Sequence, residues 1–445
     1  MRGKNFSPRL AVLLAMFAVV TPMTIPAAAQ TEDLLFSFTG SGEHGSSPAG
    51  GLIFDAAGNL YGTTIIGGAG VCGSGGCGTA FELMPAAGGG WTQKVLHSFH
   101  DNGKDGSTPV TSLILDAAGN LYGTTVNGGA HAAGVVFELT PGAGGEWTEK
   151  ILHNFGVGSD GTAPEAALIF DGAGNLYGTT SSGGAHFSGT VFELSPTATG
   201  WTEKLLHSFA GYPKDGADPV ASLVFDAAGN LYGTTAEGGK NSNCPYDRSC
   251  GTVFELTPTA GGSWTEKVLY DFKEAPDGNA PGGSLIFDAA GNLYGTTEIG
   301  GNISSCSGMA GYGCGTVFEL TPSAAGPWTE TVLHDFGTGT DGYYPGNGGL
   351  AVDAAGNLYG TTTSGGSFSR FGGVVFKLTP VGGGWTESVV HSFGEGTDGS
   401  DPYAGLIFDT LGNLYGTTYH GGTGLCTENS GGPVVGCGAV FEIAP

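Results

Sequence analysis

Charged residues are scarce in this chain of 445 residues, and basic ones are the scarcest. Asp, Glu, Lys and Arg together make up 12% of the sequence, with 14 Lys and Arg against 40 Asp and Glu, so that the formal net charge is −26. This balance disfavours nucleic acid and anionic lipid as partners, because both repel a strongly negative protein. Apolar residues still make up 40% of the chain, which is enough for a hydrophobic core and excludes a fully disordered protein.

Segments with helical periodicity are missing beyond the N-terminus, and so are long hydrophobic runs. The one apolar run, at residues 10–20, follows three basic residues and precedes small residues at 27–29. This order is typical of a secretory signal peptide, and the run is too short to remain as a membrane anchor, which is the alternative. We therefore predict a signal peptide at residues 1–29. The mature chain, residues 30–445, is then secreted to the extracellular space or the periplasm without a membrane span.

Glycine, at 87 residues, is abundant, and part of it belongs to one motif that occurs seven times. The motif, Asp-Ala-Ala-Gly-Asn-Leu-Tyr-Gly-Thr-Thr with small variations, starts at Asp55, Asp116, Asp171, Asp226, Asp288, Asp353 and Asp409. Each copy lies among four β-like segments, a to d, which in the first unit are residues 52–54, 59–64, 79–83 and 91–99. Four antiparallel strands repeated around an axis make a propeller. The sequence therefore predicts an all-β fold, a seven-bladed β-propeller of four-stranded antiparallel blades.

The first d segment stands before all other segments, and the last unit lacks one. Residues 34–38 (Leu-Leu-Phe-Ser-Phe) align with residues 95–99 (Val-Leu-His-Ser-Phe), whereas the seventh unit ends after its c segment. We therefore predict that the N-terminal strand completes the last blade, which consists of residues 403–445 together with 30–39. A closed ring leaves no unpaired blade edge, in contrast to the alternative, an open superhelix.

The repeat resembles a known family through two of its segments, Gly-Asn-Leu-Tyr-Gly-Thr-Thr and Val-Phe-Glu-Leu-Thr-Pro. Both are similar to the GloVer repeat of secreted bacterial proteins that are called choice-of-anchor proteins, and the similarity extends over essentially all of the mature chain. The resemblance implies an extracellular repeat protein and no particular activity. The chain departs from that pattern because it carries no recognisable anchor. The Asp…Gly-Asn-Leu-Tyr turn is also similar to NHL-repeat and gluconolactonase-type propellers.

Eight cysteines form four local pairs, each in a loop between segments b and c. Units two, three and six have neither member of such a pair. This all-or-none occurrence in an exported chain predicts disulfide bonds. The alternative, a zinc site, would need thiolates from different blades to converge. The predicted bonds join Cys72 to Cys77, Cys244 to Cys250, Cys306 to Cys314, and Cys426 to Cys437.

The variable loops are where we expect a binding site. In an up-and-down blade the b–c and d–a loops emerge on one face, and only the b–c loops vary strongly in length and sequence. Aromatic residues, His and Arg in these loops are the candidates because such side chains anchor binding surfaces, although each could instead pack against its neighbours. The candidates are His131, His186, Phe187, Tyr246, Arg248, Tyr312, Tyr343, Tyr344, Phe368, Arg370, Phe371, Tyr419 and His420.

Three other residue types recur with the repeat and leave alternatives open. An Asp-Gly-x-x-Pro motif in the d–a loops predicts a capped turn or, alternatively, a ring of calcium ligands. A His in segment d is interpreted as a packing or hydrogen-bonding residue and not as a metal ligand, because segment d is outermost. A Trp at the start of segment d covers the blade edge or stacks on sugars. The residues are Asp105, Asp160, Asp215, Asp277, Asp341 and Asp398; His97, His153, His207, His334 and His391; and Trp91, Trp147, Trp201, Trp264, Trp328 and Trp385.

Sequence signatures of catalysis are missing from the chain. It contains no carboxylate pair, nucleophile elbow or phosphate-binding loop, and Glu165 is the one acid near the starts of the a segments. We expect no catalytic residue, no metal and no cofactor, with calcium as the alternative. The predicted function is that of a monomeric, non-enzymatic binding or adhesion module with a glycan or protein partner. The alternatives are an extracellular enzyme of the lyase or lactone hydrolase type, and a structural component of the envelope or matrix.

Overall fold

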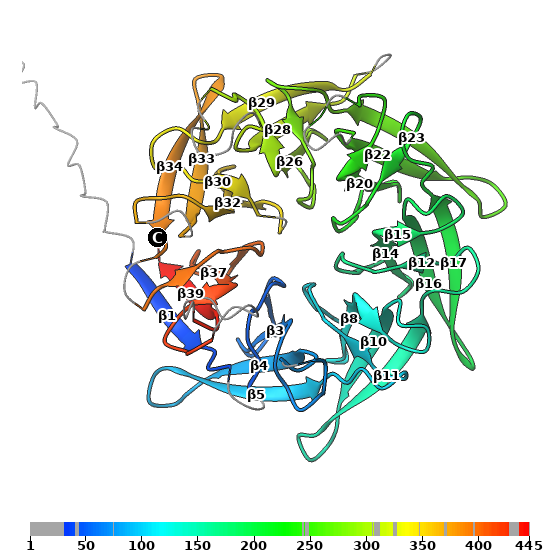
Figure 1. Ribbon diagram of the computed structural model, residues 1–445, viewed down its shortest axis with the longest axis vertical. Helices are drawn as coiled ribbons and strands as arrows, with labels where there is room; N and C mark the ends of the chain where they lie inside the picture. The colour runs from blue at the N-terminus through cyan, green and yellow to red at the C-terminus, as the bar shows by residue number, and fades with distance from the viewer. Residues whose placement is uncertain are drawn as a thin grey trace, which may run out of the picture.

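The strands of the protein form a ring of seven four-stranded antiparallel blades around a central axis (Figure 1). This is the predicted all-β, seven-bladed β-propeller. The computed structural model describes residues 31–40, 44–73, 75–242, 244, 249–304, 306, 312–323, 327–346, 348–368, 372–394, 397–426 and 436–444. None of these residues belongs to a helix that is long and apolar enough to cross a membrane.

Each blade runs from a short inner strand a to a long outer strand d. The blades, in the order a, b, c and d, are β2 (Ile53–Phe54), β3 (Leu60–Thr64), β4 (Thr79–Pro85) and β5 (Trp91–Ser98); β7 (Ile114–Leu115), β8 (Leu121–Thr125), β10 (Val135–Pro141) and β11 (Trp147–Asn154); β13 (Ile169–Phe170), β14 (Leu176–Thr180), β16 (Thr190–Thr197) and β17 (Gly200–Ser208); β19 (Val224–Phe225), β20 (Leu231–Thr235), β22 (Thr252–Pro258) and β23 (Trp264–Asp271); β25 (Ile286–Phe287), β26 (Leu293–Thr297), β28 (Thr316–Thr321) and β29 (Thr329–Asp335); β31 (Ala351–Val352), β32 (Leu358–Ser364), β33 (Val374–Val381) and β34 (Gly384–Ser392); and β36 (Ile407–Phe408), β37 (Leu414–Thr418), β39 (Ala439–Ala444) and β1 (Thr31–Ser37).

The N-terminal strand closes the ring, as the offset of the repeats predicts. β1 pairs antiparallel with β39, with Thr31 opposite Ala444 and Ser37 opposite Ala439. Figure 1 shows β1, in blue, beside β39, in red, in this blade. The edge of β39 is therefore covered by the same chain, which removes the open edge that an incomplete propeller would expose.

The a–b turn of every blade is held by the Asp that starts the motif. In the first blade, Asp55 Oδ1 accepts the backbone N–H groups of Ala57 and Asn59, at 2.8 and 2.9 Å. The Asn59 side chain and the Tyr61 hydroxyl donate to Asp55 Oδ2. Gly58 takes the left-handed backbone conformation that the turn requires, with φ of 87°. These bonds lower the pKa of Asp55 below its ordinary value, against the opposing effect of its partial burial.

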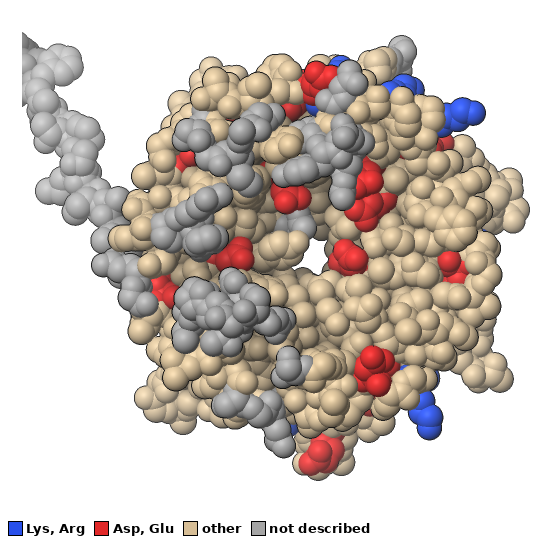
Figure 2. Space-filling model, viewed as in Figure 1, with Lys and Arg blue, Asp and Glu red and all other residues tan. Residues whose placement is uncertain are grey.

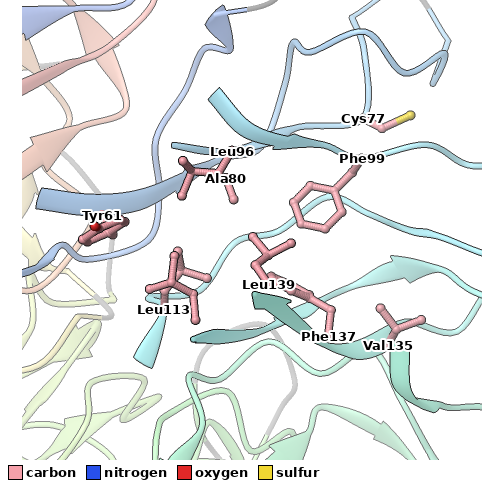
Figure 3. Packing of buried hydrophobic residues seen from close by; sticks show 10 residues of the cluster. Tyr61, Cys77, Ala80, Leu96, Phe99, Leu113, Val135, Phe137 and Leu139 are labelled. Atoms are coloured by element: carbon pink, nitrogen blue, oxygen red, sulfur yellow. The ribbon is translucent and has the colours of Figure 1, made fainter. Parts of the chain in front are cut away.

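The core lies between the blades, and each part of it combines Leu, Val and Tyr side chains with one pair of Phe rings. The Phe that follows strand d of one blade packs edge-on against the Phe of strand c in the next, as Phe99 does on Phe137 with 5.0 Å between ring centroids. Figure 3 shows these two rings beside Leu139 and Leu113. The same contact occurs at all seven junctions, including Phe38 with Phe81 where the chain ends meet.

The d–a and b–c loops share one face of the ring, which we call the loop face. Short two-stranded ladders join these loops, the first between β6 (Gly106–Ser107) and β9 (Asn127–Gly128). The other ladders join β12 (Gly161–Thr162) to β15 (Ser182–Gly183), β18 (Gly216–Ala217) to β21 (Glu237–Gly238), β24 (Gly278–Asn279) to β27 (Ile299–Gly300), and β35 (Gly399–Ser400) to β38 (His420–Gly421). In the sixth blade, β30 (Tyr343–Pro345) pairs directly with β32.

All four predicted disulfides are present in the b–c loops: Cys72–Cys77, Cys244–Cys250, Cys306–Cys314 and Cys426–Cys437. They also act on the blade junctions, because the carbonyl of the second Cys accepts a backbone N–H from the next d–a loop. The Cys77 carbonyl, for example, accepts the N–H of Thr108 at 2.9 Å. In blade two, which has no disulfide, the Ala133 carbonyl binds the N–H of Ala163 in the same way.

Candidate functional site

A cavity of about 340 Å³ lies on the ring axis, where residues of all seven blades meet. Its wall is formed by the residues that precede each strand a and by parts of the d–a loops. Figure 2 shows an opening at the centre of the ring with acidic side chains close to it. The lining residues include Thr108, Val110, Thr111, Ser112, Glu165, Ala167, Ser222, Ser284, Gly348 and Tyr403.

The axis stays open because the residue two positions before strand a is Gly, Ala or Ser in every blade. Three of these residues are Ser, and two of their hydroxyls link neighbouring blades: Ser222 Oγ accepts the N–H of Ala167 at 3.1 Å, and Ser284 Oγ accepts the N–H of Ser222 at 3.2 Å. As acceptors, both hydroxyls keep their own proton for another partner. Because Ser222 and Ser284 belong to the cavity wall, these hydroxyls can donate to a ligand there.

Among the described residues that line this cavity, Glu165 is the only one with a carboxylate. Its Oε1 accepts a hydrogen bond from the Ser181 hydroxyl at 3.2 Å. Burial nevertheless raises the pKa of Glu165 above its ordinary value, because the charged form loses solvent. Tyr403, which is 37% exposed, is the aromatic residue of the described wall. The cavity thus combines hydroxyl groups, one carboxyl group and one aromatic ring.

The predicted loop residues fall into two groups on the loop face. Tyr343 and Tyr344 both belong to β30, with 5.4 Å between their ring centroids. Tyr419 and His420 follow strand b of the last blade, where His420 Nδ1 lies 3.5 Å from Asp401 Oδ2. These four residues lie on the inner segments of the loops, and each is half-buried.

The second group lies towards the outer rim, away from the axis. The Cβ of His131 lies against Gly156, which follows the outermost strand of its blade. His186 and Phe187 take the same place in blade three, where Phe187 is 86% exposed. Phe368 is 50% exposed, and Tyr312 is half-buried with its carbonyl bound by the Gly300 N–H. The candidates Tyr246, Arg248, Arg370 and Phe371 lie outside the described residues.

The Asp of each Asp-Gly-x-x-Pro loop caps its own turn and also binds the His of strand d. Asp215 Oδ1 accepts the N–H of Gly216 at 2.7 Å, and its Oδ2 lies 3.0 Å from His207 Nε2. The five histidines thus make the predicted hydrogen bonds, and Tyr270 replaces His at one junction, donating to Asp277. The Trp at the start of strand d packs on the motif Tyr of the preceding blade, as Trp147 does on Tyr61.

A half-buried Glu from strand d of the next blade joins each of these pairs. We call the resulting groups the junction clusters: His97–Asp105–Glu149, His153–Asp160–Glu203, His207–Asp215–Glu266, Tyr270–Asp277–Glu330, His334–Asp341–Glu387 and His391–Asp398–Glu32. Burial and the neighbouring Asp carboxylate raise the pKa of these Glu side chains, to about 9 at Glu149 and to about 7 at Glu32, Glu266 and Glu330.

Sequence reasoning missed two features of these sites. Tyr403 was not among the candidates, although it and Glu165 follow the Pro of their d–a loops, where other units have Ala, Val or Gly. A departure from the repeat at a position next to the axis, which drew attention to Glu165, is the signal that could also have found Tyr403. The pairing of each strand-d His with an Asp and a Glu was also missed, because these carboxylates come from a loop and from another blade.

Seven tandem four-stranded blades around a shared axial cavity define the class of protein as a repeat-built β-propeller. The chain belongs to the family of the Gloeobacter/Verrucomicrobia repeat, whose profile matches residues 21–173, 144–309 and 251–445. This confirms the resemblance seen in the repeat sequence. No curated protein matches the chain.

Several solved structures are similar to this chain in fold. An oxidoreductase-type protein (glucose dehydrogenase) from Thermus thermophilus has 16% identity and a TM-score of 0.43, covering 75% of this chain and 95% of its own. A 6-phosphogluconolactonase-type protein from Bacteroides uniformis has 12% identity and a TM-score of 0.47, covering 81% and 96%. An ulvan lyase of polysaccharide lyase family 25 has 11% identity and a TM-score of 0.47, covering 82% and 87%. At these values the similarity concerns overall architecture, and no activity is carried over.

Proposed function

We propose that this protein is an exported, non-enzymatic binding module that takes a neutral, hydroxyl-rich ligand, such as the end of a glycan chain, into its axial cavity. The observation that carries the proposal is the composition of the cavity wall. Ser and Thr hydroxyls, one carboxyl group and the Tyr403 ring converge on a space of about 340 Å³. This volume is at the lower end of small-molecule sites, which hold ligands by a few placed polar groups and an apolar or aromatic surface.

Export is part of the same proposal. Disulfides form and persist in oxidising compartments, and the four bonds of this chain would not be maintained in a reducing cytoplasm. The signal-like segment at residues 1–29 provides the route. We propose a location outside the cytoplasm, with the loop face presented to the ligand.

Binding is favoured over hydrolysis because Glu165 has no carboxylate partner among the lining residues. Most glycosidases use two carboxyl groups, roughly 5–9.5 Å apart, as acid and as base or nucleophile. The described wall of this cavity also holds no His, Lys or Cys that could take the second role. A single carboxyl group can still form a hydrogen bond with a ligand hydroxyl.

The test is a glycan and polysaccharide array with the mature protein, followed by calorimetry on the strongest ligand. Glu165→Gln and Tyr403→Ala should each weaken binding by at least about fivefold, which corresponds to about 1 kcal/mol for one contact. His131→Ala and Phe187→Ala, at the outer rim of the same face, are the matched controls and should leave the affinity unchanged. Loss of binding in the rim variants alone would refute the cavity as the site. Ligand cleavage that disappears in Glu165→Gln would refute the non-enzymatic function.

A further inference from the structure

Each of the six junction clusters contains a carboxylate oxygen that accepts no hydrogen bond from the protein. Within the described parts of the chain, Oε1 of Glu32, Glu149, Glu203, Glu266, Glu330 and Glu387 is buried and has no hydrogen-bond partner. A buried acceptor without a donor is costly, and a negative charge next to a second carboxylate is more costly still. An unpartnered Glu oxygen at six equivalent positions indicates that a positive charge, a proton or a cation, completes the cluster.

At the seventh junction, where the ring closes, the corresponding side chains need no proton or cation. Phe36, His44 and Gln93 stand at the positions of the His, Asp and Glu. The two polar side chains satisfy each other there: His44 Nδ1 lies 2.9 Å from Gln93 Oε1, and Gln93 Nε2 donates to the His44 carbonyl at 2.8 Å. With the carboxylates absent, the described residues leave no orphaned oxygen at this junction.

The first junction differs from the other five in two ways. His100 follows Phe99, at a position where the other units have Gly, Ala, Lys or Thr, and its Nδ1 lies 3.5 Å from Asp105 Oδ2. Asp105, whose side chain is only 9% exposed, leaves its Oδ1 without a partner among the described residues. At the equivalent positions Oδ1 accepts a backbone N–H, for example that of Gly161 on Asp160. This junction therefore has one more nitrogen ligand and one more unused oxygen.

The spacing of these groups suits a tetrahedral metal ion. His97 Nε2 lies 3.1 Å from Asp105 Oδ2 and 3.6 Å from Glu149 Oε1, and His100 Nδ1 lies 3.5 Å from Asp105 Oδ2. A tetrahedral zinc ion with ligand bonds of about 2.0–2.1 Å separates neighbouring ligand atoms by about 3.3 Å. The ligand atoms of His97, Asp105 and Glu149 all lie within 4.8 Å of one another. His100 is outside this group, and its partly exposed side chain must turn towards the other three to become the fourth ligand.

We propose that His97, His100, Asp105 and Glu149 form a binding site for one divalent transition-metal ion of the zinc type, which joins the first two blades at their outer rim. Two imidazoles and two carboxylates are the nitrogen and oxygen ligands that such ions prefer, and the charge of the ion balances both carboxylates. Asp105 is held in place by the His100 backbone N–H on its Oδ2, at 2.9 Å. Because 45% of the His100 side chain is exposed, the ion can enter the site from solvent on the side of His100.

The experiment measures zinc binding to the chelator-treated mature protein at pH 7.5, by calorimetry and by metal analysis after dialysis. We expect one zinc ion to be lost, and the affinity to fall at least tenfold, in both His100→Ala and Glu149→Gln. Glu203→Gln, which makes the same change at the next junction, is the matched control and should bind zinc as the unaltered protein does. Cobalt in place of zinc should give the visible absorption of tetrahedral coordination, and this absorption should be lost in His100→Ala.

The results that would overturn the proposal are equally definite. Zinc binding that is unchanged in both His100→Ala and Glu149→Gln would place the metal elsewhere. The absence of zinc binding to the folded protein at millimolar zinc would mean that a proton completes this cluster. Because His100 is a partly exposed residue, loss of fold in Glu149→Gln would still leave His100→Ala as a usable test, and near-ultraviolet circular dichroism identifies folded variants.

Discussion

The second Gly of the motif determines how closely strand b approaches the core Phe of strand c. A Cβ at Gly178 would lie 2.7 Å from Cζ of Phe192 and 3.0 Å from Leu168 Cδ2. Gly178→Ala should therefore lower the free energy of unfolding by about 1–3 kcal/mol, because the buried ring must shift. Gly172→Ala in the same blade is the control, since nothing lies near that position and other units have Ala there. Urea unfolding compares the two, and equal midpoints would contradict this packing.

Glu330 is the residue at which pH dependence can be tested without a nearby His. Burial and Asp277 raise its pKa from 4.5 to about 7, Asp335 adds to the rise, and Lys273 opposes it. The folded state then binds the proton more tightly than the unfolded state, so the stability from this group is complete below pH 4.5 and is lost as the pH rises through 7.

Glu330→Gln removes this dependence, because the amide is neutral at every pH. We expect the variant to melt about 1–3 °C above the unaltered protein at pH 8, a modest rise because solvent screens part of the effect, and at the same temperature at pH 5. Glu146→Gln, at an exposed position, should show no such difference. The difference in melting temperature between Glu330→Gln and the unaltered protein should be larger at pH 8 than at pH 5. A larger difference at pH 5 would contradict the raised pKa. Calorimetric scans at both pH values measure it.

At the scale of strands and loops, the features within one unit could be predicted from the sequence, whereas the side-chain contacts between blades could not. The a–b turn, the strands and the disulfides follow from residues within a few positions of one another, such as Asp55 and Asn59. The contact of His97 with Glu149 joins residues of two units, and its formation depends on how outer strands pack. Repetition showed that these residues are periodic, but periodicity alone did not show which of them face each other.

The Cys72–Cys77 disulfide belongs to this scale, because it constrains one loop and one junction. Replacing both residues by Ala should lower the free energy of unfolding by about 2–3 kcal/mol, the entropy of a short closed loop, and leave the ring folded. The reason is that Ala133 binds the next d–a loop in blade two without a disulfide. The urea midpoint with and without the double substitution measures the effect. Loss of the folded ring would show that the bond is needed for closure.

At the scale of the whole molecule, we expect the stability of the ring to depend on its last junction. Each blade buries its Phe against the next blade, so the chain has no self-sufficient end. The final junction joins Phe38 to Phe81 and lets the Thr417 hydroxyl donate to the Gly50 carbonyl at 3.3 Å. The offset that places strand d of the last blade at the N-terminus converts the two chain ends into one sheet, so opening the ring requires breaking the pairing of β1 with β39.

Removal of residues 31–38 tests this closure directly. The truncated chain keeps all of β39 but leaves its edge unpaired and Phe81 without its ring partner, so we expect a much lower melting temperature and self-association through the open edge. A synthetic peptide of residues 31–38 added in excess should restore the monomer, because it supplies the missing strand without altering the rest of the chain. The full mature chain, which starts at residue 30, is the control. An unchanged melting temperature after the truncation would mean that the other six junctions hold the ring on their own. Light scattering in the same experiment would show whether a second copy of the chain closes the ring instead.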